Sequence, residues 1–325
     1  MNTNARYAVG VDVGGTKLAV AVIDREGAAP RKIKLPVAKE SVAASVRQIV
    51  EAIYRAVEAT AISWGQVAGI GVGIPGIYFA ESGKAWAPNL WGWEQIALRD
   101  ELCLQLPAPV TIDSDRAAYV LGEQWLGAAR GLSDVVFLAV GTGIGAGIIT
   151  GGRLCRGAGN IAGAVGWFAL DPCQKEIYQQ MGCLEAEAAG PAVARRVVAY
   201  LSAGEESVIH DLAGGDTERV TTEIVVDAAR RGDALARRVL EEAASYLGMG
   251  VANIISILNP QMVVLGGGLM QAGELLLEPL RREALRRAQP LAAEQARIEL
   301  SHLGEDAGLL GAARLAFLRQ TGNEI

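Results

Sequence analysis

The chain has 325 residues, 51% of them hydrophobic, and its 30 basic and 36 acidic residues give a formal net charge of −6. This length is enough to bury a large core and exceeds one comfortable domain, so we expect two lobes. No run of basic residues resembles the electrostatic footprint that nucleic acid requires, which argues against nucleic acid as a partner.

The cysteine pattern and the hydropathy predict a cytoplasmic protein. Four cysteines show neither the density of a disulfide scaffold nor CxxC spacing. The first apolar run contains charge, which does not fit a signal peptide. The uncharged stretch 243–273 is interrupted by polar residues and glycines, so we interpret it as a buried helix followed by a buried strand and expect no membrane partner. The cysteines are Cys103, Cys155, Cys173 and Cys183.

Two segments of the sequence are predicted to be hairpins with the same pattern. Residues 7–24, YAVGVDVGGTKLAVAVID, are rich in valine on both sides of a glycine pair, which predicts strand, tight turn and strand. Residues 134–150, DVVFLAVGTGIGAGIIT, repeat this pattern. The repeat suggests an internally duplicated, two-lobed architecture.

The rest of the chain alternates apolar runs and helical periodicity. Residues 151 to about 190 look irregular, and the pattern from there to residue 258 is mostly helical. The other predicted elements are a helix over 40–60, a strand over 67–78 ending at a glycine-containing loop, a buried strand over 260–268 and a closing helix over 304–320.

The glycine turns of the two hairpins are candidate phosphate sites. Glycine lets backbone N–H groups approach an anion, and a neighbouring Thr hydroxyl or Lys ammonium adds donors. An ordinary hairpin turn is the alternative for either cluster alone. The candidates are Gly14, Gly15, Thr16 and Lys17 in the first hairpin, with Asp12 placed to hold Mg²⁺ through water, and Gly141, Thr142, Gly143 and Gly145 in the second.

A third glycine cluster, Gly266, Gly267 and Gly268, follows the buried strand and precedes a predicted helix. Close approach of backbone to an adenine ring or a ribose is one interpretation. A plain turn between strand and helix is the other.

The order of these motifs resembles one family nearly end to end. The motifs VGVDVGGTK, GIGVGIPG, APNL, DSDRAA, LAVGTGIGAGII, GCLEAEAAGPA, NPQMVVLGGG and GEDAGLLGAA are similar to those of the ROK family of sugar kinases and related repressors, in the actin-like ATPase superfamily. The resemblance implies an α/β, two-lobed actin-like ATPase (ribonuclease H-like) fold with a cleft, and transfer of the γ-phosphoryl group of ATP, with Mg²⁺, to a sugar hydroxyl. We expect residues 1–116 and 306–325 to form the smaller lobe and 117–305 the larger. The resemblance also suggests a homodimer.

The catalytic base implied by the resemblance is Asp115, because Ser114-Asp115 stands where the family has an Asn-Asp pair. A strand ending at Asp113 and a helix beginning near Ser114 would put Asp115 at a helix N-terminus, whose dipole favours the ionised form. An ionised carboxylate can take the proton of the attacking hydroxyl. A simple helix cap is the alternative for Asp115. For Asp113 we expect a supporting role or exposure to solvent.

The segment RGAGNIAGAVGWFALDPCQKEIYQQMGCLE departs from the family. Typical members resemble RGAHGxAGExGH followed by three cysteines, and there the Glu and the last His contact sugar hydroxyls while the His and the cysteines hold zinc. Here Ala164 and Trp167 replace that Glu and His, and Glu176 and Tyr178 stand at two of the cysteine positions. We therefore expect no structural zinc, with packing by Trp167, Phe168 and Tyr178 in its place.

The acceptor is expected to be atypical, because both lost groups are polar sugar contacts. Amino sugars, cyclitols and modified hexoses fit this change, and ordinary hexoses such as glucose or fructose stay open. Besides Ser114 and Asp115, the resemblance assigns Gly76, Asn89 and Glu185 to the substrate. Asn89 is alternatively a turn residue, and Glu185 is alternatively an acid at a helix N-terminus.

Two alternatives to kinase activity stay open. One is a ligand-sensing regulator, which the early start of the first hairpin disfavours because ROK repressors carry an N-terminal DNA-binding extension. The other is a non-catalytic member whose sugar site has decayed, as the changes at Ala164 and Trp167 would allow.

Overall fold

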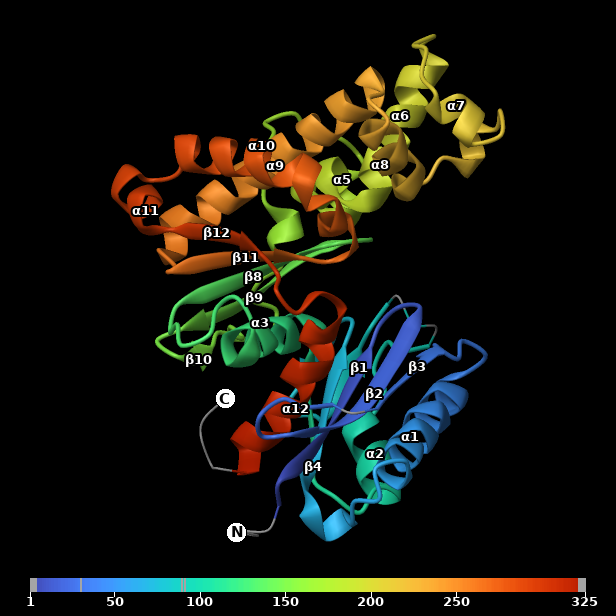
Figure 1. The fold of residues 1–325 in the computed structure, drawn as a ribbon, viewed down its shortest axis with the longest axis vertical. Coiled ribbons are helices and arrows are strands. Elements are labelled where there is room, and N and C mark those ends of the chain that lie inside the picture. The colour runs from blue at the N-terminus through green and yellow to red at the C-terminus, as the bar shows by residue number, and fades with distance from the viewer. Residues whose placement is uncertain (1–4, 30, 89, 91, 321–325) are drawn as a thin grey trace. The chain divides into compact units, whose positions relative to one another are not determined.

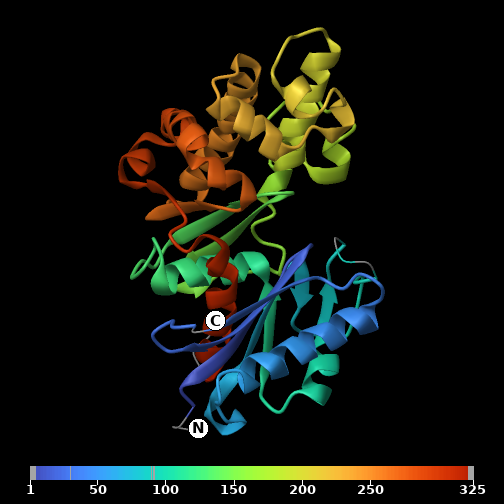
Figure 2. The same ribbon diagram turned by 45° about the vertical axis from the view of Figure 1, so that its right-hand side comes forward.

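The computed structural model describes residues 5–29, 31–88, 90 and 92–320 (Figures 1 and 2). The chain divides into two compact units. The first consists of residues 1–137, 147–163 and 301–325, and the second of 138–146 and 164–300. The expected lobe boundaries at residues 116 and 306 stay a prediction. Asn89 lies outside the described residues.

The first sheet lies in the first unit. Its strands are β1 (Tyr7–Val13), β2 (Lys17–Asp24), β3 (Lys32–Pro36), β4 (Val67–Ile74) and β7 (Val110–Ser114), and β5 (Ile77–Phe79) and β6 (Lys84–Trp86) form a separate hairpin. The order is β3-β2-β1-β4-β7, with β1, β4 and β7 parallel and β2 and β3 antiparallel to their neighbours. The helices are α1 (Val42–Glu58), α2 (Leu98–Gln105), α3 (Asp115–Leu126) and α12 (Ala307–Gln320), with single 3-10 turns at Trp64–Gln66 and Gly304–Asp306.

The second sheet repeats the same order, as the two similar hairpins predicted. Its order is β10-β9-β8-β11-β12, and the boundary between the two units runs through β8 and β9. The strands are β8 (Val135–Val140), β9 (Ile144–Thr150), β10 (Arg153–Leu154), β11 (Met262–Gly266) and β12 (Arg297–Leu300).

The predicted irregular region contains short helices that are too brief for a periodic pattern to reveal. The longer helices after it agree with the prediction, and α10 packs along α9 in the second unit (Figure 1). The helices are α4 (Tyr178–Met181), α5 (Cys183–Ala188), α6 (Gly190–Ser202), α7 (Ile209–Leu212), α8 (Thr222–Arg230), α9 (Ala234–Leu258), α10 (Gly273–Arg287) and α11 (Pro290–Gln295), with 3-10 turns at Val165–Trp167, Thr217–Arg219 and Gly268–Ala272.

Alternation along β1 places Asp12 on the face of the first sheet that α12 covers. Successive side chains of a strand point to opposite faces. The valines at 9, 11 and 13 join the core formed with α1 and α2, whereas Ala8 joins a second core with residues of α12. Figures 1 and 2 show α1 and α12 on opposite sides of this sheet. Asp12 shares its face with Ala8 and Gly10 and therefore points toward α12.

Small residues bring α12 and α3 close to this face. A Cβ on Gly71 would lie 1.7 Å from the carbonyl oxygen of Ala312, and one on Gly311 would lie 1.7 Å from that of Ala118. Larger side chains at these glycines would force the helices away from the sheet and from each other. The small residues of α12 thus hold its first turn next to Asp12.

Among the helices of the described ranges, none combines the length and the apolar character needed to cross a membrane. The uncharged stretch 243–273 is the end of α9, strand β11 and the turn after it, as predicted.

Candidate active site

Three parallel strands of the first sheet end in one row that carries two acids. Asp12 of β1 is opposite Gly73 of β4, and Gly73 is opposite Asp113 of β7. Ligand sites of α/β sheets lie beyond the carboxyl ends of such strands. Asp115 follows two residues after Asp113, and its Cα lies 3.7 Å from the position that a Cβ on Gly73 would take. The topology therefore gathers Asp12, Asp113 and Asp115 at one edge.

Asp115 is the first residue of α3, as expected, and Ser114 caps the helix. The Ser114 hydroxyl accepts a hydrogen bond from the backbone N–H of Ala117 at 3.2 Å, and the carboxylate of Asp115 accepts one from the N–H of Arg116 at 2.7 Å. Burial raises the pKa of Asp115 to about 6, although the Arg116 charge and the helix N–H lower it. The helix start acts in the expected direction, and desolvation outweighs it, so the pKa of Asp115 lies above its ordinary value.

Asp12 is the acid of this group with the fewest hydrogen bonds among the described residues. Its Oδ1 is shielded from solvent and has no hydrogen-bond partner among the described residues. Burial, and then the charge of Asp115, raise the pKa of Asp12 to about 7. Gly308 of α12 makes room for this carboxylate, since a Cβ there would lie 2.5 Å from Asp12 Oδ2. A buried carboxylate oxygen without a donor fits a divalent cation or one of its water ligands.

Tyr119 is a member of this group that the sequence analysis missed. It lies one helical turn after Asp115, and its hydroxyl is 3.5 Å from Asp115 Oδ2. Its ring packs on Phe137 with centroids 5.3 Å apart. Burial, and then the charges of Asp115 and Asp12, raise the pKa of Tyr119, which keeps the hydroxyl a neutral donor. The i, i+4 spacing from Asp115 was the available signal.

Asp113 has the supporting role and is not exposed to solvent. Its Oδ2 accepts charge-assisted hydrogen bonds from Arg156, at 2.8 Å from Nε and 2.7 Å from a terminal nitrogen, and its Oδ1 accepts the Ser114 N–H at 2.8 Å. Asp113 is 8% exposed. This pairing ties the RGAG motif to the end of β7.

The first predicted phosphate turn joins β1 to β2. The N–H of Gly14 donates to the carbonyl of Lys17 at 2.8 Å, which closes the turn. Thr16 and Lys17 are exposed, and the Lys17 ammonium lies 3.9 Å from Glu305. Gly15 lies in the same turn, between Gly14 and Thr16. These residues remain candidates for binding phosphate.

Gly76 has a clear packing role in the structure. A Cβ there would lie 2.1 Å from the carbonyl oxygen of Trp86. Only glycine lets the loop after β4 approach the end of β6 this closely. The substrate contact expected for Gly76 stays a prediction.

The second and third glycine clusters lie together in the second unit. The position of a Cβ on Gly141 is 3.8 Å from the nitrogen of Gly268, and one on Gly267 would lie 2.4 Å from the Val140 carbonyl oxygen. Gly267 has φ +94°, a conformation that favours glycine. Thr142 and Gly143 form the tip of the β8–β9 turn, Gly145 lies in β9 and Gly266 ends β11. The strand order therefore explains how two separate nucleotide candidates become neighbours.

Glu185 lies in the first turn of α5 and reaches the same hairpin. Its Oε2 accepts a hydrogen bond from the N–H of Ile144 at 2.7 Å, and a Cβ on Gly143 would lie 2.9 Å from that oxygen. Burial raises the pKa of Glu185 against this hydrogen bond. The acid therefore stands at a helix start and beside a glycine turn, and the substrate contact expected for Glu185 stays a prediction.

Trp167 does not pack in the way that was expected. It is 56% exposed, so it cannot replace zinc as a core group. Its backbone passes close to Gly182, where a Cβ would lie 2.5 Å from Trp167 Cα. Gly166, its neighbour, approaches Glu185 Oε2. An exposed indole thus belongs to the segment that adjoins Glu185.

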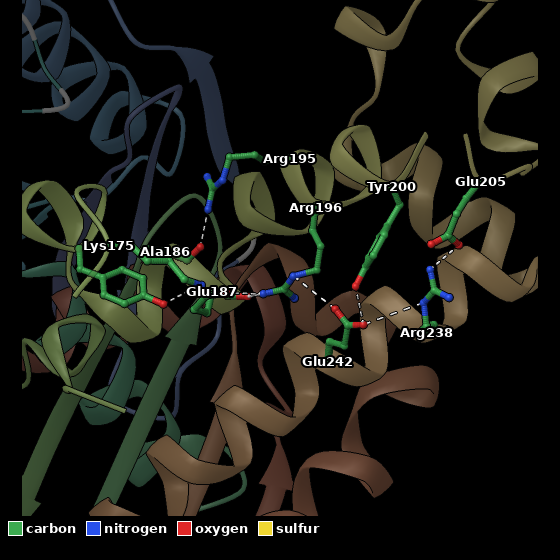
Figure 3. A network of polar contacts seen from close by, with 10 residues as sticks. Lys175, Ala186, Glu187, Arg195, Arg196, Tyr200, Glu205, Arg238 and Glu242 are labelled. Atoms are coloured by element: carbon green, nitrogen blue, oxygen red, sulfur yellow. Dashed lines mark hydrogen bonds and ion pairs between the residues drawn. The ribbon is translucent and has the colours of Figure 1, made fainter. Parts of the chain in front are cut away.

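Tyr178 packs as expected but in a different kind of cluster. It is buried with Cys183 and Ala186, and its hydroxyl donates to the carboxylate of Glu187. Glu187 also accepts from Lys175 at 2.6 Å and from Arg196 at 2.5 Å. Figure 3 shows Arg196 continuing from Glu187 to Glu242 of α9, where the ion pair measures 3.4 Å. Polar contacts therefore join α4, α5, α6 and α9.

No group of three or more His, Cys, Asp or Glu residues that could hold a metal ion occurs in the part of the chain that the structure describes. The prediction of no structural zinc stays a prediction. Asp12, with its unpartnered oxygen, remains the candidate for magnesium.

The model of the ROK family matches residues 8–318, so the chain belongs to the ROK family. A glucokinase of Thermotoga maritima is 34% identical over 314 residues, which are 94% of this chain and 96% of that protein. A xylose repressor of Caldicellulosiruptor bescii is 36% identical over 248 residues, 75% of this chain and 61% of that protein.

Solved structures agree with this assignment. A ROK family glucokinase from Streptomyces griseus, in complex with glucose and AMPPNP, superposes with a TM-score of 0.80 at 31% identity, covering 96% of this chain and 99% of that one. The fold is therefore the mixed α/β fold of the actin-like ATPases, as predicted.

Proposed function

We propose that the protein is an ATP-dependent kinase that transfers the γ-phosphoryl group to a hydroxyl of a sugar or a sugar-like polyol. The observation on which the proposal rests is the acid pair, Asp12 and Asp115, at the carboxyl ends of the parallel strands. Asp115 has a pKa of about 6, suited to a general base near neutral pH, and Asp12 has a buried oxygen with no donor. Similarity to glucokinases over nearly the whole chain supports it.

Asp115 accepts the proton of the attacking hydroxyl as the bond to phosphorus forms. The N–H of Arg116 and the hydroxyl of Tyr119 orient its two oxygens, so that one lone pair is available to the acceptor. Asp12 holds magnesium directly or through water, and the ion would neutralise charge on the phosphates when it is bound. The glycine turns of the two hairpins bind the phosphates through backbone N–H groups.

The acceptor is a polyol that offers an apolar ring face. Ala164 brings no polar group to the segment where the family has a glutamate, and Trp167 exposes its indole there. An indole binds the C–H face of a sugar or a cyclitol by stacking. Glu185, beside Gly166, supplies an acceptor of hydrogen bonds from ring hydroxyls.

The test is an ADP-release assay with Mg²⁺ across hexoses, amino sugars and cyclitols. We expect turnover with at least one of them, lost in Asp115→Asn with nucleotide affinity kept. Asp100→Asn removes an exposed carboxylate of α2 and is the matched control, which should turn over normally. Full activity of Asp115→Asn would overturn the role of Asp115.

A second candidate is a ROK member that binds a sugar-like ligand without phosphorylating it. The similarity to a xylose repressor favours it, together with the replaced sugar contacts at Ala164 and Trp167. Polyol binding by calorimetry, without any ADP release by the unmodified protein, would select this candidate.

A further inference from the structure

A second basic site lies in the first unit, beside the C-terminal half of α3. A cavity of about 1220 Å³ opens there between α3, α12, the turn after β2 and the turn between β9 and β10. Its lining includes Arg25, Arg130, Arg153 and Arg314, against a single acid, Glu26. The charged side chains of the lining therefore sum to +3, in a chain whose net charge is −6. Such local excess charge attracts anions.

Arg314 lacks a counter-charge. It is half-buried, and among the described residues no side chain or carbonyl accepts a hydrogen bond or an ion pair from it. Burial, and then the charge of Arg25, lower the pKa of Arg314. A guanidinium that is partly desolvated next to another cation costs stability unless an anion binds it.

Aromatic rings hold the two guanidinium groups in position. Arg314 lies over the ring of Trp125 at 5.5 Å, Trp125 meets Phe317 edge to face at 5.9 Å, and Arg25 lies over Phe317 at 4.8 Å. Arg25 is further fixed by hydrogen bonds to the Ala5 carbonyl at 3.2 Å and to the Gln320 side chain at 2.6 Å. Arginines fixed in this way lose little side-chain entropy when they bind a ligand.

We propose that this cavity binds a small phosphate ester of a polyol. Planar guanidinium groups bind phosphate oxygens in pairs, and a phosphate ester brings more negative charge to this lining of +3 than a single carboxylate does. The cavity is far larger than one phosphate, and Trp125 offers an apolar face to the remainder of the ester. None of its lining residues belongs to the acid pair or to the glycine turns, so this site goes beyond the proposed kinase reaction.

The experiment is calorimetric titration of the full chain, without nucleotide, with glucose 6-phosphate, inorganic phosphate and glucose. We expect the ester to bind and glucose alone not to bind this site. Arg314→Gln should weaken binding of the ester by about tenfold or more, the effect of removing one charge-assisted pair. Arg282→Gln is the matched control, because Arg282 is an exposed arginine of α10 in the second unit and has no partner among the described residues. It should leave the affinity unchanged.

Two further variants separate this site from the catalytic one and from a folding defect. An ester bound only as a product of the kinase reaction would be lost in Asp115→Asn and kept in Arg314→Gln, and this result would overturn the proposal whether or not the protein is a kinase. Arg130→Gln changes an exposed side chain that has no partner in the part of the chain that the structure describes, so it should weaken binding of the ester with no change in melting temperature.

Stability supplies an independent readout. Arg314→Gln should melt no lower than the unmodified protein when no ligand is present, and the ester should raise the melting temperature of the unmodified protein only. Equal affinity of Arg314→Gln and Arg282→Gln would overturn the proposal.

Discussion

Asp12 and Asp115 of the first unit and Glu187 of the second unit are buried carboxylates that differ in the hydrogen bonds that they accept. Asp12 has an oxygen with no donor, and burial raises the pKa values of Asp12 and Asp115 to about 7 and about 6. For Glu187, burial acts in the same direction, but hydrogen bonds from Lys175, Tyr178 and Arg196 outweigh it and lower the pKa. Glu187 is therefore a satisfied anion, and Asp12 is not.

The difference separates function from structure. An acid without donors destabilises the fold when it ionises, and such an arrangement is retained at sites where a cation or a substrate supplies the missing partner. An acid surrounded by donors stabilises the fold and has no lone pair left for chemistry. Glu123 belongs to the second kind, since it is fully buried and accepts from Ser301, from the N–H of Ala128 at 2.7 Å and from that of Leu303 at 3.1 Å.

The largest expected effect is on turnover. Asp115→Asn removes the base but keeps the shape of the side chain, so we expect kcat to fall about a thousandfold, within the range for loss of a general base. The same change should not lower the free energy of unfolding, because it removes a buried charge. ADP release and urea unfolding measure the two quantities. A variant that keeps kcat and loses stability would place Asp115 with Glu187 as a structural acid.

Glu187→Ala should lower the free energy of unfolding. It leaves Arg196 and Lys175 without their shared anion, and we expect the free energy of unfolding in urea to fall by about 3 kcal/mol. Glu176→Ala removes an exposed acid of the same segment and should change it by less than about 0.5 kcal/mol. Equal losses in the two variants would show that the network contributes nothing beyond surface charge.

Some of the residues in this comparison were predictable from the sequence, and others were not. Asp12 and Asp115 followed from the strand, turn and helix patterns, and from the resemblance. Tyr119 was missed although its i, i+4 spacing from Asp115 was a local signal. Gly308 was not predictable, because α12 reaches Asp12 from nearly 300 residues further along the chain and no local period encodes that approach. Glu187 was missed for a similar reason. Its three donors, Lys175, Tyr178 and Arg196, come from three different segments, while the sequence of α5 alone shows only an acid on a short helix.

Two differences from the sequence analysis have one physical cause, namely burial that local sequence does not reveal. The helix start at Ser114 was predicted correctly, but the sequence did not indicate that the packing of α12 and α3 on the sheet desolvates Asp115 and raises its pKa to about 6. Trp167 was expected in the core and is exposed, because the Tyr178 and Glu187 cluster fills that role without it.

Asp12→Asn gives a smaller and oppositely signed effect on stability. The pKa of Asp12 is raised from 3.8 to about 7 in the folded chain, so ionisation destabilises the fold progressively as pH rises between these values. A shift of about three units corresponds to roughly 4 kcal/mol, and partial exposure should halve it, so we expect the variant to be more stable by about 2 kcal/mol at pH 8. The gain should shrink at pH 5. Urea unfolding at both values measures it, and a variant destabilised at pH 8 would mean that Asp12 already has its partner within the protein.

The pH dependence of kcat/KM distinguishes the role of Asp115 from that of Asp12. Asp115 must be ionised to act as base, so activity should fall about fivefold between pH 6 and pH 5. Asp12 must be ionised to hold magnesium, which predicts a second loss of activity as pH falls below about 7 at low Mg²⁺. Because the cation competes with the proton only at Asp12, raising Mg²⁺ should move that second limb to lower pH and leave the Asp115 limb in place. Asp100→Asn should reproduce both limbs. A single limb that follows Mg²⁺ entirely would remove Asp115 from the role of base and leave Asp12 as the one acid of the pair that titrates in function. A profile that is flat from pH 5 to pH 8 would remove both acids from these roles.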